Sequence, residues 1–153
     1  MANTYTQINI HVIFAVKGRK NLITDKFKDE LFKYLSGGLK GENQYPLAVG
    51  GYKDHVHVFF ELHPTTSVSY VVQQIKQSSS KWINSKRFVQ GHFEWQAGYG
   101  AFSYARSQRN DVIQYIINQE AHHKKTSFKD EYFRILRKFE IEFKDEYVFE
   151  FYE

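Results

Sequence analysis

The sequence predicts an α+β domain of the ferredoxin-like or RRM-like type. This fold is a split βαβ sandwich, an antiparallel sheet with helices on one face, here followed by an extra C-terminal helix. Two observations predict it. The chain of 153 residues is 42% hydrophobic, which suits one domain with a sizeable core. Segments with strand-like and helix-like apolar patterns alternate in the order strand, helix, strand, strand, helix, strand, helix.

The first strand and helix are marked by a change of period. Residues 5–16 alternate apolar and polar side chains, which indicates a strand. Thr24 or Asp25 can begin a helix, and Gly37 and Gly38 are expected to end it. The apolar stripe of this helix consists of Phe27, Leu31, Tyr34 and Leu35.

The next segment predicts a hairpin. Its arms are residues 45–51 and 54–62, and Tyr52 and Lys53 lie near the turn. Side chains in the second arm alternate between two faces. One face carries Val56, Val58, Phe60 and Leu62, and the other carries His55, His57, Phe59 and Glu61.

The second half of the chain predicts helix, strand and helix. Ser67 can begin a helix whose buried stripe ends near Trp82. Residues 93–106 read as a strand with a bulge or bend at residues 98–100. Ser107 can begin a further helix, over about residues 108–124. The other face of the sheet is left open for a ligand or for additional helices.

Charge separates a basic body from an acidic tail. The formal net charge is +4, but residues 1–127 hold 16 basic against 9 acidic side chains, whereas residues 128–153 hold 5 against 8. A basic body suits a polyanionic partner, although it is also common on ordinary surfaces. We expect residues 1–125 to form the main domain. Residues 126–153 would be an acidic helix beginning at Ser127 and a tail packed on the same domain, with residues 141–152 as a strand or extended arm.

Two absences narrow the class of protein. There is no cysteine, which excludes disulfides and thiolate metal sites. The first residues lack a basic-then-apolar signal, and no apolar run approaches the ~20 residues needed to cross a bilayer. We expect a cytoplasmic protein with no membrane partner.

The His55-Val-His57 strand is the first candidate site. Residues two apart on a strand emerge on one face with Cα atoms roughly 6–7 Å apart, so both imidazoles can bind one ion. Asp54 could orient an imidazole by accepting a hydrogen bond from the ring nitrogen that does not bind the ion. A bare His-x-His is common by chance and also fits two exposed histidines on a half-buried strand. A metal role therefore needs a third ligand and a reactive group.

Tyr115 and Gln119 form the second candidate site. They are four residues apart on the late predicted helix and so share one helical face. Singly, each has an ordinary interpretation, because Tyr115 is one of 11 tyrosines and a glutamine usually lies on the surface. His122 lies on nearly the same stripe. The pairing of His-Val-His with a later Tyr-x-x-x-Gln is far more specific than either motif alone.

Together these motifs resemble the HUH single-strand DNA transposases of small bacterial insertion sequences, the TnpA family, whose relatives include the REP-associated tyrosine transposases. The resemblance covers roughly residues 5–125 and leaves out the acidic tail. The matching segments are His11-Val-Ile-Phe, Gly50-Gly-Tyr-Lys-Asp-His-Val-His-Val and Tyr115-Ile-Ile-Asn-Gln119, supported by residues 76–82 and 93–102.

The resemblance implies a role for each residue. His55, His57 and Gln119 would bind Mg²⁺, or Mn²⁺ in its place, and Tyr115 would be the nucleophile on a catalytic helix. Ligand chemistry alone would also admit zinc, cobalt or nickel. His122 or His123 could replace or join Gln119. The substrate would be single-stranded DNA with hairpin ends, joined to the enzyme as a 5′-phosphotyrosine, and the protein a homodimer with composite active sites.

DNA contacts are expected from basic and aromatic side chains. The candidates for phosphate contacts are Lys17, Arg19, Lys20, Lys76, Lys81, Lys86, Arg87, Arg106 and Arg109. Trp95, Tyr99 or Phe102 could stack on bases. The ordinary alternatives are a solvated charge for each lysine and core packing for Trp82 and Trp95.

Three other functions stay open at this level. A domesticated relative would cut chromosomal hairpin repeats of the REP type without moving itself. A non-enzymatic RRM-like module would bind single-stranded RNA or DNA on its sheet. A metal-dependent hydrolase would use the histidines but leave Tyr115 unexplained.

Overall fold

A computed structural model describes residues 3–144 of the chain. The elements are β1 (Asn9–Ala15), α1 (Lys28–Gly41), β2 (Tyr45–Tyr52), β3 (His55–Glu61), α2 (Val68–Lys86), β4 (Gly100–Tyr104), α3 (Arg109–Ile117), α4 (Gln119–His123) and α5 (Phe128–Lys138). Short 3-10 turns follow β1 and β4, at Lys17–Arg19 and Arg106–Gln108. None of the described helices is long and apolar enough to span a bilayer.

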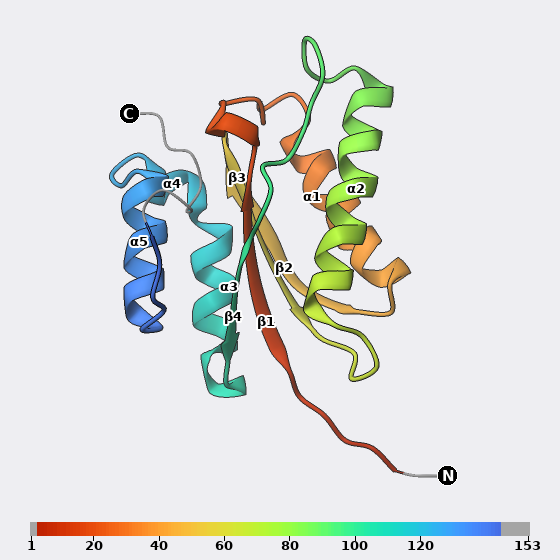
Figure 1. Ribbon diagram of the computed structural model, residues 1–153, viewed down its shortest axis with the longest axis vertical. Coiled ribbons are helices and arrows are strands. Elements are labelled where there is room, and N and C mark those ends of the chain that lie inside the picture. The colour runs from red at the N-terminus through yellow and green to blue at the C-terminus, as the bar shows by residue number, and fades with distance from the viewer. Residues whose placement is uncertain (1–2, 145–153) are drawn as a thin grey trace.

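The four strands form one antiparallel sheet in the order β2-β3-β1-β4. Helices α1 and α2 cover one face, and α3, α4 and α5 lie on the other (Figure 1). This is the split βαβ plan with additional C-terminal helices, so the predicted fold class is confirmed. β3 lies between β1 and β2, and His57 pairs with Ile13 on one side and Gly50 on the other.

The alternation of β3 divides its side chains between two cores. Val56, Val58 and Phe60 join the main core beneath α1 and α2. Phe59 faces the other way and packs against Val112 and Ile116 of α3. The two histidines therefore point toward the C-terminal helices and not into the main core.

Helix α5 closes the remaining part of that second face. Phe128, Tyr132 and Leu136 are buried against Ile13, Ala15 and Phe102 of β1 and β4. Ser127 begins the helix as expected, because its hydroxyl accepts a hydrogen bond from the Asp130 amide. The acidic segment is thus packed on the body of the domain through residue 138. Residues 145–152 of the expected terminal strand or arm lie outside the described residues.

Several predicted boundaries were wrong. The first strand spans Asn9–Ala15 and not residues 5–16, and helix α1 begins at Lys28 after Phe27, so neither Thr24 nor Asp25 caps it. Helix α1 runs through Gly37 and Gly38 to Gly41, because its buried stripe continues to Leu39 and outweighs the low helix propensity of two glycines. The late helix is broken at Asn118 (φ −91°, ψ 18°) into α3 and α4. It begins at Arg109 after a 3-10 turn, so Ser107 is not its cap.

The predicted strand 93–106 was also too long, since only Gly100–Tyr104 belongs to the sheet. Gly98 has a φ of +91°, which bends the chain just before β4. The preceding segment is bonded to α2, because the Asn84 side chain pairs with both backbone groups of Phe93 and the Lys76 ammonium donates to the Gln96 and Gly98 carbonyls. Within residues 93–99 the predicted ladder is reduced to an isolated antiparallel bridge between Trp95 and Val16, and the side-chain hydrogen bonds from α2 take its place elsewhere in the segment.

Gly50 allows α3 to lie directly on β2 beside the histidines. A Cβ atom at this position would come 2.5 Å from the Ile116 carbonyl oxygen. We therefore expect Gly50→Val to destabilise the protein by about 1–3 kcal/mol through overpacking, and to reduce any activity that needs α3 in place. Urea unfolding measures the first effect. Gly37→Ala is the matched control, because open space surrounds Gly37 in its helix and the change should stabilise it slightly. A fully stable Gly50→Val protein would contradict the close contact.

Candidate active site

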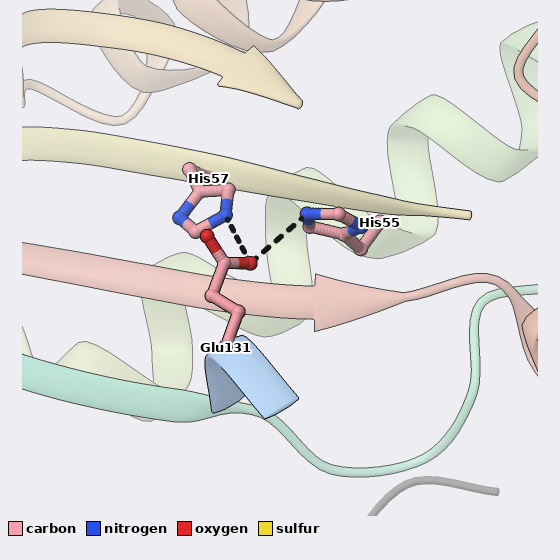
Figure 2. Close-up of side chains that lie close together, drawn as sticks. All are labelled: His55, His57 and Glu131. Atoms are coloured by element: carbon pink, nitrogen blue, oxygen red, sulfur yellow. Dashed lines mark ion pairs between the residues drawn. The ribbon is translucent and has the colours of Figure 1, made fainter. Parts of the chain in front are cut away.

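The two histidines of β3 are fully buried and face α4 and α5 (Figure 2). His55 Nδ1 lies 2.7 Å from the Asp54 carboxylate, the partner that the sequence suggested. Since a carboxylate accepts, Nδ1 is the protonated nitrogen when His55 is neutral, and Nε2 presents its lone pair to the site. His57 Nδ1 lies 2.8 Å from His11 Nε2, so His11 orients His57.

Tyr115 and Gln119 reach the same place despite the break at Asn118. The Tyr115 ring centroid is 5.7 Å from that of His57, and Gln119 Oε1 is 3.1 Å from His55 Nε2. Gln119 is buried, whereas Tyr115 is only partly buried. The tyrosine thus lies beside the histidines of its own chain, so the convergence does not need a second subunit.

Glu131 of α5 completes the cluster, and the sequence analysis missed it. One of its carboxylate oxygens, Oε1, lies 3.4 Å from Nε2 of His55 and 3.4 Å from Nε2 of His57 (Figure 2). The other, Oε2, accepts hydrogen bonds from the Tyr115 hydroxyl and from the Gln119 amide. A signal was present, since Glu131 is an acidic residue within the apolar stripe of α5. A charge in such a position is rarely buried without partners.

His123 also joins the cluster, and His122 lies at its edge. His123 Nε2 is 2.9 Å from Gln119 Oε1 and 3.1 Å from Glu131 Oε1. Its Nδ1 lies 2.7 Å from the Thr126 carbonyl, which can only accept, so Nδ1 carries the hydrogen of the neutral ring. His122 Nε2 is 3.3 Å from Glu131 Oε2, and its side chain is 21% exposed.

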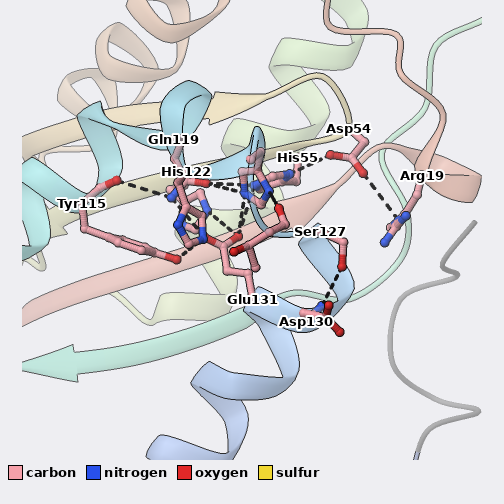
Figure 3. Close-up of polar contacts among 12 residues, drawn as sticks. Arg19, Asp54, His55, Tyr115, Gln119, His122, Ser127, Asp130 and Glu131 are labelled. Atoms are coloured by element: carbon pink, nitrogen blue, oxygen red, sulfur yellow. Dashed lines mark hydrogen bonds and ion pairs between the residues drawn. The ribbon is translucent and has the colours of Figure 1, made fainter. Parts of the chain in front are cut away.

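Figure 3 shows the polar contacts of this cluster. When the imidazoles are neutral, four acceptor atoms face one another and none carries a hydrogen: Nε2 of His55, Nε2 of His123, Gln119 Oε1 and Glu131 Oε1. Gln119 donates its amide hydrogens to Glu131 and to the Tyr115 carbonyl, which turns its oxygen toward His55 and His123. When neutral, those two imidazoles also present lone pairs. His57 Nε2 makes no hydrogen bond among the residues that the structure describes. Such a set is satisfied either by extra protons on the imidazoles or by a cation, and imidazole, amide and carboxylate ligands suit a divalent ion.

The close packing of these titratable side chains shifts their pKa values. Burial opposes the charged form of His55, but hydrogen bonds to Asp54 and Glu131 raise its pKa to about 9. Although burial acts against it, the pKa of Glu131 is held far below its ordinary value by the surrounding histidines. Burial and the Glu131 carboxylate raise the pKa of Tyr115 well above its ordinary value. Its phenol therefore keeps its proton at neutral pH.

The expected DNA contacts lie in varied settings. Lys20, Lys81, Lys86, Arg87 and Arg106 are exposed. Lys17 is exposed and paired with Glu94 at 2.8 Å. Among the others, Lys76 is half-buried on α2, where burial lowers its pKa to about 8, and Arg109 is paired with Glu61.

Arg19 differs from the other candidates. Its guanidinium is buried 3.6 Å from Asp54 and lies over the ring of Phe128. This position places Arg19 beside Asp54, the hydrogen-bond partner of His55, and does not favour the predicted phosphate contact. Of the stacking candidates, Trp95 and Phe102 are buried and Tyr99 is exposed.

Comparison with known proteins identifies the family of the chain. A candidate transposase from Deinococcus radiodurans is 23% identical, with a TM-score of 0.62 over 78% of this chain and 96% of that one. A REP-associated tyrosine transposase bound to a REP hairpin is 13% identical, with a TM-score of 0.58 over 80% and 73%. No curated protein matches the chain. Residues 4–119 match the model of IS200-like transposases, and the chain belongs to that family of DNA-processing enzymes.

Proposed function

We propose that the protein is a metal-dependent single-strand DNA transposase with Tyr115 as its nucleophile. The observation that supports this most is the meeting, within one chain, of the Tyr115 phenol with His55, His57 and Gln119. A hydrolase that used only the histidines would leave the phenol without a role. The open sheet face that an RNA platform needs is covered by α3, α4 and α5, which disfavours a non-enzymatic module.

His55, His57 and Gln119 would hold the ion, Mg²⁺ or Mn²⁺. Asp54 and His11 fix the two imidazoles so that Nε2 of each faces the site. A bound divalent cation polarises the scissile phosphate and neutralises charge that develops there.

Tyr115 would attack the phosphorus atom of the scissile phosphodiester. A bond forms between the phenol oxygen and phosphorus, and the bond from phosphorus to the 3′-oxygen breaks, which leaves a 5′-phosphotyrosine and a 3′-hydroxyl. The phenol loses its proton as it attacks, and the leaving 3′-oxygen gains one. Because the linkage keeps the energy of the phosphodiester, a 3′-hydroxyl can later attack it and rejoin the strands without an external energy source.

The substrate would be single-stranded DNA with hairpin ends. The solved relative bound to a REP hairpin favours this class of substrate, and it also suggests the alternative of a domesticated REP-type nuclease. A cleft of about 310 Å³ borders Tyr115, is lined also by Tyr104, Asp111, Arg134 and Lys138, and leaves open space beside the tyrosine. Two ends must be held for strand exchange, so we propose a homodimer. Shared, composite active sites stay a prediction.

The test is a covalent adduct. The protein is incubated with Mg²⁺ and single-stranded DNA from the borders of its own gene, labelled on the 3′ side of the cut, and is then denatured and resolved by electrophoresis. We expect a labelled protein band that chelator prevents. Nuclease digestion followed by hydrolysis of the protein should then release phosphotyrosine. Cleavage that leaves no label on the protein would contradict a tyrosine nucleophile. Transfer of the labelled end to a second strand distinguishes a transposase from a nuclease that only cuts.

A further inference from the structure

Glu131, in the C-terminal segment, places a carboxylate beside the candidate metal ligands His55 and His57. Glu131 lies outside the matched residues 4–119, yet its side chain is completely buried among the histidines. Phe128, one turn earlier, stacks on the His55 ring with centroids 3.9 Å apart and an interplanar angle of 8°. Tyr132 and Leu136 hold the later turns against the sheet. These contacts fix α5 so that Glu131 points at both imidazoles (Figure 2).

The distances match those between ligands of a single ion. Ligands about 2.1 Å from one ion lie roughly 3.0 Å apart at a right angle and roughly 3.4 Å apart at the tetrahedral angle. Glu131 Oε1 is 3.4 Å from Nε2 of both His55 and His57, and the ligand atoms of these three residues all lie within 4.8 Å of one another. No large movement of α5 is needed for them to share an ion.

Charge favours the same interpretation. Two imidazoles and the Gln119 amide offer only neutral ligands, whereas hard divalent ions prefer sites with at least one carboxylate. A buried carboxylate is costly unless a cation or several hydrogen bonds offset it. Glu131 supplies the one negative charge at the centre of this cluster, and a divalent ion would offset that charge.

We propose that Glu131 is a protein ligand of the catalytic metal, added to His55, His57 and Gln119 by the C-terminal helix. This inference rests on the proposed metal-dependent function. A different role fits some of the same contacts. Because the carboxylate touches both Tyr115 and the histidines, it could instead occupy the place of the scissile phosphate and block it. The two roles predict opposite effects of removing the charge.

Metal binding without DNA tests the proposal. Chelator-stripped full-length protein is titrated with Mn²⁺ alone by calorimetry, and the shift of Tm with Mn²⁺ is recorded in parallel. We expect Glu131→Gln to weaken Mn²⁺ affinity by at least tenfold. Even residues that only hydrogen-bond to metal ligands typically contribute 10–100-fold to metal affinity. Asp130→Asn is the matched control, because it removes the same charge from the neighbouring, exposed position of α5 and should leave affinity unchanged.

Each outcome separates this inference from the proposed function. Equal or tighter Mn²⁺ binding by folded Glu131→Gln overturns the ligand role, and higher adduct yield with it would indicate the blocking role. Circular dichroism in chelator checks that the variant folds, and Glu131→Asp, which keeps the charge, should retain part of the affinity. Wild-type protein that binds no Mn²⁺ contradicts the metal site as a whole. Adduct formation that depends on Tyr115 would stand in either case.

Discussion

Tyr115→Phe should abolish the covalent protein–DNA adduct and reduce strand cleavage by roughly 10⁴-fold or more, because it removes the attacking oxygen itself. The cost to folding should be small. The variant loses one hydrogen bond to Glu131, whose Oε2 keeps the Gln119 amide at 3.0 Å as a partner. A loss of about 1–2 kcal/mol in the free energy of unfolding is the most that we expect. Gel analysis of labelled DNA measures the activity, and urea unfolding measures the stability.

Tyr34→Phe is the control for this change. Its hydroxyl donates to the Ser78 carbonyl from α1, on the opposite face of the sheet. The same atom is removed there, so adduct yield should stay at the wild-type level. An adduct that persists in Tyr115→Phe would discard the assignment, and mass spectrometry of the labelled peptide would then identify the true nucleophile.

His57→Ala should abolish the stabilising effect of Mn²⁺ and reduce cleavage by roughly 10²- to 10⁴-fold, the worth of several kcal/mol of charge stabilisation at the phosphate. His57 is fully buried and is bonded to His11, so the variant should also be less stable in chelator. The diagnostic quantity is therefore the difference in Tm with and without Mn²⁺ and not Tm itself. That difference should be positive in the wild type and close to zero in the variant.

His92→Ala controls for the loss of an imidazole. The side chain of His92 is 70% exposed and pairs with Glu94 at 3.4 Å. Both the Mn²⁺ shift and the adduct should be unchanged in this variant. Folded His57→Ala that still gains stability from Mn²⁺ would show that the ion binds elsewhere.

Local periodicity predicted which candidate residues share a face, and the family resemblance predicted that the two motifs belong to one site. The alternation of β3 alone decides that His55 and His57 share a face opposite Val56. Helical spacing likewise placed Tyr115 and Gln119 on one side, and the break at Asn118 did not undo this because the two side chains still point at one place. The fold class followed from the order of elements, which tolerates errors of several residues at their ends.

The features of the site and fold that the sequence did not predict depend on tertiary packing. Nothing in the local pattern around residue 131 says that α5 folds back onto the sheet, so the buried position of Glu131 could be suspected only from an acidic residue in an apolar stripe. The burial of Arg19 arises in the same way, because α5 lays Phe128 against its guanidinium. The segment before β4 was wrongly predicted as a continuous strand. Its hydrogen bonds to α2 come from the side chains of Asn84 and Lys76, and the apolar periodicity of the segment carries no information about them.

The packing of α5 on β1 and β4 has a practical consequence for expression. A chain that stops at residue 119, where the family match ends, would uncover Ile13, Ala15 and Phe102, all at most 3% exposed in the whole protein. An apolar sheet face of this kind promotes association between copies. Truncated versions designed from the family boundary alone should therefore precipitate, and biochemical work on this enzyme requires a chain that includes α5.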